Sequence, residues 1–200
     1  MFKKTLIIIV ILFIIGCSEM PENKKDLSKY KIATLAGGCF WCMEAAYEPL
    51  DGVIEVISGF SGGNEANPTY EDVVYGKTGH YESVQIYYDP NLISYEEIIE
   101  FYWRNIDPTD SEGQFVDKGK HYRTAIFYAN ENEKAIAEAS KLKLENSKMF
   151  DKPIVTEIRP FKSFYKAEEY HQDYYKKRTL NYKVYEKGSG RDQYKEKYWN

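Results

Sequence analysis

The chain has 200 residues, a formal net charge of −4 at pH 7, 19 tyrosines and three cysteines. Its excess of acidic residues argues against nucleic-acid binding, which requires a basic face. Once the N-terminal segments described next are set aside, about 160 residues remain, enough for one domain with one hydrophobic core. The many tyrosines predict a sheet-rich interior packed with aromatic rings that carry polar tips.

The first residues predict a processed leader. Lys3 and Lys4 give a basic start, and residues 5–15 are almost wholly apolar. This run is too short to span a bilayer comfortably as a helix, but it suits the core of a signal peptide. It ends in Ile14-Ile15-Gly16-Cys17, which resembles the lipobox of a bacterial lipoprotein.

The lipobox implies that residues 1–16 are a lipoprotein signal peptide and that Cys17 becomes the lipidated first residue. The protein would then be extracytoplasmic and anchored to a bacterial membrane through Cys17. An uncleaved anchor and a plain signal peptide are the alternatives. Residues 17–30 are polar and contain Pro21, so they predict a tether that does not pack.

Hydrophobic periodicity and turn residues predict strands and helices that alternate along the next part of the chain. The predicted strands are 31–36, 53–58, 83–88, 124–128 and 154–158. The predicted helices are 43–48, 69–76, 94–105, 131–149 and 166–177, with helix starts at Thr69 with Asp72 and at Ser94 with Glu97. Residues 59–64 predict a flexible loop, and residues 107–120 predict a long one.

This alternation implies a sheet that helices cover on at least one face. Periodicity alone fits a two-layer sandwich as well as a doubly wound sheet. The folded domain is expected to span residues 31–187, and residues 188–200, which begin with Gly188-Ser189-Gly190, are expected to form a polar tail.

The most informative stretch is Gly37-Gly38-Cys39-Phe40-Trp41-Cys42, between a predicted strand and a predicted helix. Cys39 would sit at a helix N-terminus, where exposed N–H groups favour the reactive thiolate. Cys42 would lie one turn further on the same face. A disulfide across so small a loop adds little stability, so the pair predicts redox chemistry rather than a structural bridge.

A metal site is the other common use of two such cysteines. Zinc would require two more ligands. His80, His121 and His171 are the only histidines and are scattered singly along the chain. We therefore expect no metal site.

Several short motifs, in this order, resemble those of a known family. They are Gly38-Cys39-Phe40-Trp41, Asn67-Pro68-Thr69-Tyr70, Thr78-Gly79-His80-Tyr81-Glu82, Tyr88-Asp89-Pro90, Asp117 with Tyr122-Arg123, and Glu168-Glu169-Tyr170-His171-Gln172. Over about residues 32–175 the chain closely resembles peptide methionine sulfoxide reductase A.

The resemblance implies an α+β fold, a two-layer α/β sandwich with a ferredoxin-like mixed sheet and flanking helices. It also implies reduction of the S epimer of methionine sulfoxide, free or in proteins, without a cofactor. Residues 31–187 would then be a methionine sulfoxide reductase domain that repairs oxidised extracytoplasmic proteins, and we expect it to act as a monomer.

Reduction of a sulfoxide requires attack on a polarised sulfur while the oxygen takes up protons. Cys39 is the nucleophile by the resemblance and by its position at a helix start. Glu82 takes the role of proton donor by the resemblance, and burial at the start of an apolar strand would raise its pKa and keep it protonated near neutrality. Tyr70 and Tyr122 match the tyrosines that hydrogen-bond the sulfoxide oxygen.

Three further residues complete the pocket that the resemblance implies. Asp117 matches the acidic residue that orients the polar network. Phe40 and Trp41 match the apolar wall that holds the substrate methyl group, and such a wall excludes water and strengthens the polar contacts inside. His121 departs from the family pattern, because glutamine is frequent at that position.

Reduction would leave a sulfenic acid on Cys39, and a nearby thiol would condense with it to form a disulfide. Many family members have glycine at the position of Cys42 and recycling cysteines near the C-terminus. Residues 187–200 contain no cysteine, so Cys42 is the resolving residue by elimination. A thioredoxin-like dithiol partner must then reopen the disulfide.

Two other functions remain open at this point. A thiol–disulfide oxidoreductase could use the same Cys39 and Cys42 pair, without any dependence on sulfoxide. A lipoprotein that binds a ligand or partner could carry the two cysteines merely as a pair, and then Cys39→Ser would leave its function intact.

Overall fold

The computed structural model describes residues 25–199. The predicted signal peptide, Cys17 and most of the predicted tether lie outside the described residues. Lys25, near the end of the predicted tether, contacts the domain, because its Nζ donates to Ile54 O at 2.8 Å and to Glu55 at 2.9 Å. Within the described part of the chain, no helix has the length and apolar character needed to cross a membrane.

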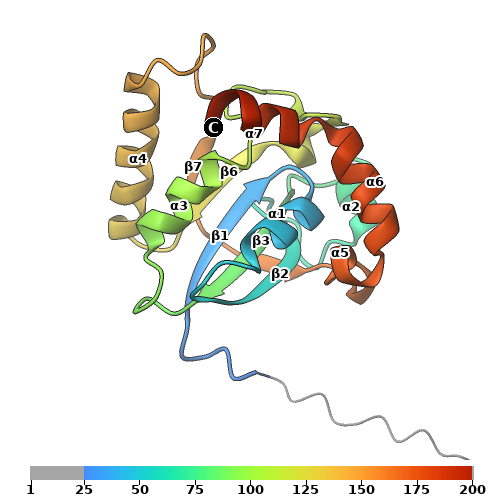
Figure 1. The fold of residues 1–200 in the computed structure, drawn as a ribbon. Coiled ribbons are helices and arrows are strands. Elements are labelled where there is room, and N and C mark those ends of the chain that lie inside the picture. Colours follow the sequence, from blue (N-terminus) through green and yellow to red (C-terminus); the bar gives the residue numbers. More distant parts are fainter. Residues whose placement is uncertain (1–24, 200) are drawn as a thin grey trace, which may run out of the picture.

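The fold is a six-stranded sheet with flanking helices (Figure 1). The strands of this sheet are β1 (Lys31–Gly37), β2 (Val53–Ser61), β3 (Tyr81–Tyr88), β6 (Thr124–Tyr128), β7 (Glu157–Pro160) and β8 (Phe164–Lys166). Two short strands, β4 (Gly113–Gln114) and β5 (Asp117–Lys118), form a separate pair. The helices are α1 (Phe40–Tyr47), α2 (Tyr70–Val74), α3 (Tyr95–Trp103), α4 (Glu131–Asn146), α5 (Tyr174–Lys177), α6 (Thr179–Ser189) and α7 (Arg191–Trp199).

The strand order is β7-β6-β1-β3-β2-β8. All neighbours are antiparallel except β6 and β7, which are parallel. The chain therefore forms a mixed sheet, and the strands predicted near 31–36, 83–88 and 124–128 are confirmed. The capping boxes at Thr69 and Ser94 are confirmed as well, at the starts of α2 and α3.

The main core lies between one face of the sheet and the helices α1, α3 and α4. Figure 1 shows α1 across β1, β2 and β3, with α4 on the outer side of α3. Alternate residues of β1 face this core, including Ala33 and Leu35. A smaller cluster on the other face contains Ala36, Tyr81 and Phe127. The sheet is thus covered by helices on one face, which agrees with a two-layer arrangement.

Buried tyrosines take part in this core, as their number predicts. The hydroxyl of Tyr102 donates to Ala36 O at 2.7 Å, and the hydroxyl of Tyr47 donates to Ile98 O at 2.9 Å. Both side chains are fully buried. Each ring therefore fills the core while its polar tip is satisfied by a backbone carbonyl.

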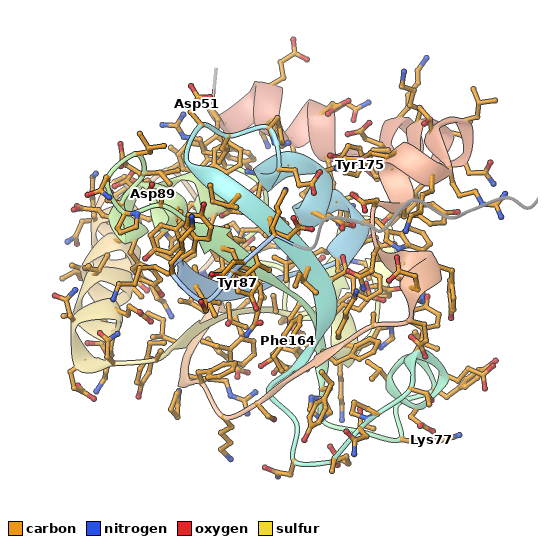
Figure 2. The ribbon with its side chains drawn as sticks, turned by 90° about the horizontal axis from the view of Figure 1, so that it is seen from below. Asp51, Lys77, Tyr87, Asp89, Phe164 and Tyr175 are labelled. Carbon is orange, nitrogen blue, oxygen red and sulfur yellow. The ribbon has the colours of Figure 1, made fainter. Side chains whose placement is uncertain are left out.

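The predicted loop 59–64 is partly strand, which corrects the sequence-based expectation. β2 continues to Ser61, because Phe60 is fully buried and lies opposite Glu82 on β3 and Tyr165 on β8. Gly59 permits this close approach, since a Cβ there would lie 2.4 Å from the Phe164 ring. Figure 2 shows Phe164 near the end of β2 that is remote from Asp51.

The C-terminal quarter differs most from its prediction. The predicted strand 154–158 begins only at Glu157. The single helix predicted over 166–177 is instead β8, a 3₁₀ turn (Glu169–His171) and the short α5. Gln172 explains part of this difference, because its side chain bonds both the N–H and the carbonyl of Ser58 and so ties the segment to β2.

The predicted polar tail 188–200 is also corrected, for residues 188–199. Ser189 ends α6, Gly190 adopts a left-handed φ of 86°, and α7 starts at Arg191. Figure 1 shows α6 and α7 along the end of the sheet where β1 leads into α1. Arg191 is only 4% exposed, so this segment is packed into the domain.

Candidate functional site

Cys39 lies where β1 passes into α1. Gly38 has a φ of 81°, a left-handed conformation that favours glycine, and a Cβ at this position would lie 2.6 Å from Gln114 Cβ. The chain therefore turns sharply and places Cys39 at the N-cap of α1. Cys42 follows within the first turn, and its N–H donates to Cys39 O at 3.1 Å. Both cysteines are free and buried.

Cys39 lines a small pocket of about 50 Å³. Its lining comes from segments far apart in the sequence: Cys39, Phe40 and Trp41 at α1, Tyr70 on α2, Glu82 on β3, Asp117 on β5, Tyr122 in a 3₁₀ turn, and Tyr185 on α6. All the pocket residues that the resemblance implied are thus brought together. Cys42 does not line this pocket, and Tyr185 is an addition that sequence reasoning missed.

Glu82 is buried at the base of this pocket. It is 1% exposed, and its Oε2 accepts a hydrogen bond from the Phe40 N–H at 3.0 Å. Burial raises the pKa of Glu82 well above its usual value, and the nearby Cys39 adds to the rise, while the Phe40 hydrogen bond acts against it. The predicted direction of the pKa shift is therefore confirmed. A raised pKa favours the protonated carboxyl group, which is the form that can donate a proton.

A hydrogen bond between the two thiols shifts the pKa of each, which the sequence did not indicate. Burial raises the pKa of the Cys39 thiol, and a hydrogen bond to Cys42 adds to the rise. The same hydrogen bond lowers the pKa of Cys42. Desolvation of Cys39 opposes the favourable helix N-terminus, and the hydrogen bond between the thiols favours ionisation of Cys42. That Cys39 is the reactive thiolate stays a prediction.

Arg191 is the functional residue that sequence reasoning missed most clearly. Its Nη1 and Nη2 lie 3.3 and 3.4 Å from Oδ2 of Asp117, and the guanidinium covers the Phe115 ring at 4.7 Å. Its positive charge favours the thiolate form of both cysteines: it opposes the rise in the pKa of Cys39 and adds to the lowering of the pKa of Cys42. The hydroxyl of Tyr185 donates to the same Oδ2 at 2.5 Å. Asp117 therefore orients two groups beside the thiols.

The apolar wall of the pocket is supported from behind by rings of the C-terminal segment. Trp41 stacks on Tyr174 with ring centroids 3.7 Å apart, and its Nε1 donates to Nδ1 of His171 at 3.2 Å. Burial lowers the pKa of His171 to about 4, so the ring is neutral near pH 7 and Nδ1 can accept. His171 therefore positions Trp41, which agrees with a structural role for this histidine.

A buried carboxyl group fixes the same segment to α1. Glu44 is 1% exposed and accepts hydrogen bonds from the Ser58 hydroxyl at 3.2 Å and from the Asp173 N–H at 2.9 Å. Burial raises the pKa of Glu44 to about 7. The bond from Asp173 fixes the backbone directly before Tyr174, the residue that stacks on Trp41.

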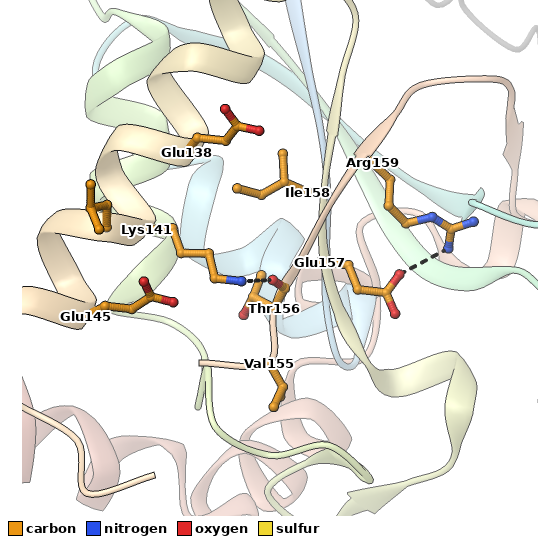
Figure 3. Close-up of a pocket in the computed structure, with 9 residues that line it drawn as sticks. Glu138, Lys141, Glu145, Val155, Thr156, Glu157, Ile158 and Arg159 are labelled. Atoms are coloured by element: carbon orange, nitrogen blue, oxygen red, sulfur yellow. Dashed lines mark hydrogen bonds and ion pairs between the residues drawn. The ribbon is translucent and has the colours of Figure 1, made fainter. Parts of the chain in front are cut away.

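A larger hollow of about 530 Å³ lies between α4 and β7, as Figure 3 shows. Its polar contacts are a hydrogen bond from Lys141 Nζ to Thr156 O at 2.9 Å and an ion pair between Arg159 and Glu157 at 3.5 Å. Neither cysteine lines this hollow. Size alone therefore does not identify the site, and the chemistry lies in the small pocket at Cys39.

A buried thiol pair at a helix start, beside an aromatic pocket that contains a buried carboxyl group of raised pKa, defines a thiol-dependent oxidoreductase. Residues 31–200 match the family described as "Peptide methionine sulfoxide reductase". The chain belongs to this family and is a methionine sulfoxide reductase of the MsrA type.

Relatives and solved structures agree with this family. The chain is 51% identical over 172 residues to peptide methionine sulfoxide reductase MsrA of Bacillus pumilus, covering 86% of this chain and 97% of that protein. MsrA 2 of Staphylococcus aureus is 50% identical over 167 residues, covering 84% and 94%. The structure is similar to reduced Mxr1 from Saccharomyces cerevisiae, with a TM-score of 0.69, 36% identity, and coverage of 78% of this chain and 90% of that chain.

Proposed function

We propose that the enzyme reduces the S epimer of methionine sulfoxide, free or in proteins, through a Cys39 sulfenic acid and a Cys39–Cys42 disulfide. The observation that carries this proposal is the shared pocket of Cys39, the buried Glu82 and the Phe40 and Trp41 rings. In this pocket a nucleophile, a proton donor and an apolar surface for a methyl group face the same small volume.

In the first step the Cys39 sulfur attacks the sulfoxide sulfur. The Cys39 proton passes to the thiolate of Cys42, a form that the lowered pKa of Cys42 favours, and Glu82 transfers its proton to the sulfoxide oxygen. Tyr70 and Tyr122 hydrogen-bond that oxygen as its negative charge develops. The S–O bond then breaks as the hydroxyl group moves to Cys39. This leaves methionine, Cys39 as sulfenic acid and Glu82 as carboxylate, so all atoms and charges are accounted for.

In the second step the Cys42 thiol attacks the sulfur of the Cys39 sulfenic acid. Water leaves, taking up the Cys42 proton, and a disulfide joins the two residues. A thioredoxin-like dithiol then returns both cysteines to the reduced state and becomes a disulfide itself. The short separation within one helical turn supports Cys42 in the resolving role.

The test uses reduced protein, excess substrate and no added reductant. We expect the S epimer of a blocked methionine sulfoxide to give one methionine per chain with loss of two thiols, and the R epimer to give no product. Product release would be measured by chromatography and free thiols by titration. A wild-type protein that keeps two free thiols after reaction would contradict the role of Cys42. Absence of product from both epimers would contradict the activity, and product from the R epimer would contradict the proposed stereospecificity.

We also propose that the enzyme is a lipid-anchored, extracytoplasmic protein. The lipobox-like Ile14-Ile15-Gly16-Cys17 supports this localisation, and repair of oxidised extracytoplasmic proteins is the corresponding role. We expect the intact mass of the mature protein to show removal of residues 1–16 and a lipid on Cys17. Cys17→Ala should lose membrane fractionation. Unmodified full-length chain in the cytosol would contradict the proposal.

We further propose that the fold is ferredoxin-like and that the enzyme acts as a monomer. The elements β1, α1, β2, β3, α3 and β6 follow the β-α-β-β-α-β order, and their strands are arranged as β6-β1-β3-β2, which supports this fold. Nucleophile, carboxyl group and apolar wall are all supplied within one copy of the chain, so the proposed chemistry requires no residue of a second copy.

A further inference from the structure

Arg191 is a buried cation at the start of α7. It is 4% exposed and is the one lysine or arginine that is buried among residues 25–199. Gly190, with its left-handed φ of 86°, turns the chain between α6 and α7, and the Arg191 N–H donates to Ser189 Oγ at 3.3 Å. Because a charged side chain is seldom buried without a partner, the contacts of Arg191 indicate its role.

The Arg191 guanidinium lies against the turn that leads into Cys39. Its Nη2 is 3.1 Å from the position that a Cβ on Gly38 would take. The same group covers the Phe115 ring, and Arg191 lines a hollow of about 260 Å³ together with Cys42. The last helix therefore brings a positive charge to the strand–helix turn that carries both thiols (Figure 1).

The partner of this cation connects it to the Cys39 pocket. Asp117 Oδ2 lies 3.3 Å from Nη1 of Arg191 and also accepts a hydrogen bond from the Tyr185 hydroxyl at 2.5 Å. Asp117 and Tyr185 both line the Cys39 pocket, whereas Arg191 does not. Arg191 therefore acts on this pocket through these two side chains.

The charges beside the thiols require a cation. The first step of the proposed function uses a thiolate of the cysteine pair, close to the Asp117 carboxylate. Asp117 raises the pKa of Cys42 and Arg191 lowers it, so the two residues act on that thiol in opposite directions. Without Arg191, a carboxylate and a thiolate would be two like charges in one buried cluster, and the thiolate would be disfavoured.

Other titratable groups near the thiols do not replace this cation. The groups that face the pair are Tyr70 on α2, Glu82 on β3, Asp117 on β5, Tyr122 in its 3₁₀ turn, and Tyr182 and Tyr185 on α6. Lys195 is the other cation that lines the hollow at Cys42, and Glu186 and Asp192 line it as well. Arg191 is the cation that contacts the Asp117 carboxylate.

We propose that Arg191 is a positioning residue of the reductase, which holds Asp117 and Tyr185 at the pocket and allows a carboxylate and a thiolate to coexist beside it. The inference rests on the proposed function, because that function supplies the step that uses the thiolate. The C-terminal helix α7 is then part of the catalytic apparatus, although it contributes no side chain to the Cys39 pocket.

The first test measures thiolate formation and requires no sulfoxide. Rates of alkylation of Cys39 and Cys42 by iodoacetamide are measured against pH, peptide by peptide, with mass spectrometry. We expect Arg191→Gln to move the thiolate titration of the pair up by about one pH unit, because a nearby opposite charge is lost. Arg191→Lys keeps the charge and should titrate close to wild type. An equal shift in both variants would overturn the role of the charge.

A double variant separates the effect of charge from an effect on folding. Arg191→Gln leaves Asp117 without its counter-ion, whereas Asp117→Asn with Arg191→Gln removes both charges. We expect the thiols of the double variant to titrate near wild type, because a thiolate then has no carboxylate beside it at this position. A double variant shifted as far as Arg191→Gln would show that only the packing of α7 matters and would overturn the inference.

The second test measures methionine release in a single turnover of prereduced protein. At pH 7 we expect Arg191→Gln to be slower by about tenfold, because a shift of one unit lowers the thiolate fraction by that factor. The matched control is Lys197→Gln, which removes the same charge from an exposed position of α7 and should change neither measurement. A folded Arg191→Gln protein with wild-type alkylation and turnover would overturn the inference. Absence of methionine from the wild-type protein would instead contradict the proposed function, so the two failures are distinguishable.

Discussion

Glu82→Gln should lower kcat/KM by about 10²- to 10⁴-fold, because the substitution keeps the shape of the side chain and removes the proton donor. The amide oxygen of the glutamine can still accept a hydrogen bond from the Phe40 N–H, so the start of α1 stays in place. Burial raises the pKa of Glu82, so the wild-type rate should fall as pH rises through that pKa. The variant should lose this high-pH decline. Steady-state rates across pH would measure both effects.

Stability gives an independent check on this prediction. A carboxyl group whose pKa is raised on folding binds a proton in the folded state that it loses in the unfolded state. The free energy of unfolding therefore falls as pH rises above the unfolded pKa of Glu82, up to its folded pKa. Glu82→Gln should remove this decline and be no less stable than wild type at pH 7 by denaturant unfolding. A destabilised variant would show that Glu82 acts through structure, and an unchanged pH–rate profile would contradict its role as donor.

Cys42→Ser should release one methionine per chain and then stop. Cys39 can still attack the sulfoxide, but residues 25–199 then contain no second cysteine to condense with the sulfenic acid that follows. The single turnover should be slower than in wild type, because serine accepts the Cys39 proton poorly. A dicarbonyl probe for sulfenic acid should label Cys39 in the stalled protein, and thioredoxin should sustain little further turnover.

Cys39→Ser is the control for this experiment, because it should give no methionine and no sulfenic acid label. Normal steady-state turnover of Cys42→Ser with thioredoxin would show that the resolving thiol is not required. Labelling of Cys39 at less than one equivalent, with one methionine released, would show that another group takes up the oxygen. Both measurements are independent of the pKa of Glu82.

The sequence predicted local features well where a short stretch of residues makes its own bonds. The capping boxes of α2 and α3 need only Thr69 with Asp72 and Ser94 with Glu97, three residues apart. The turn at Gly38 likewise follows from glycine in a left-handed conformation between a strand and a helix.

Prediction failed where distant segments decide the structure. Phe60 extends β2 because β3 and β8 pair with it on both sides. Residues 166–177 are not one helix, because Gln172 bonds β2 and Glu44 holds the N–H of Asp173. Residues 188–199 predict a polar tail because few of them are apolar. In the structure, the buried ion pair between Arg191 and Asp117 holds this segment against the domain.

The sequence by itself determined the chemistry of this enzyme: which residue types are present, the spacing of Cys39 and Cys42, and the motifs that identify the family. Only the tertiary structure decided how that chemistry is controlled. Burial raises the pKa of Cys39, the hydrogen bond between the thiols lowers the pKa of Cys42, and Arg191 reaches the pair from α7. Desolvation and charge act through space, so they depend on the packing of segments that are far apart along the chain.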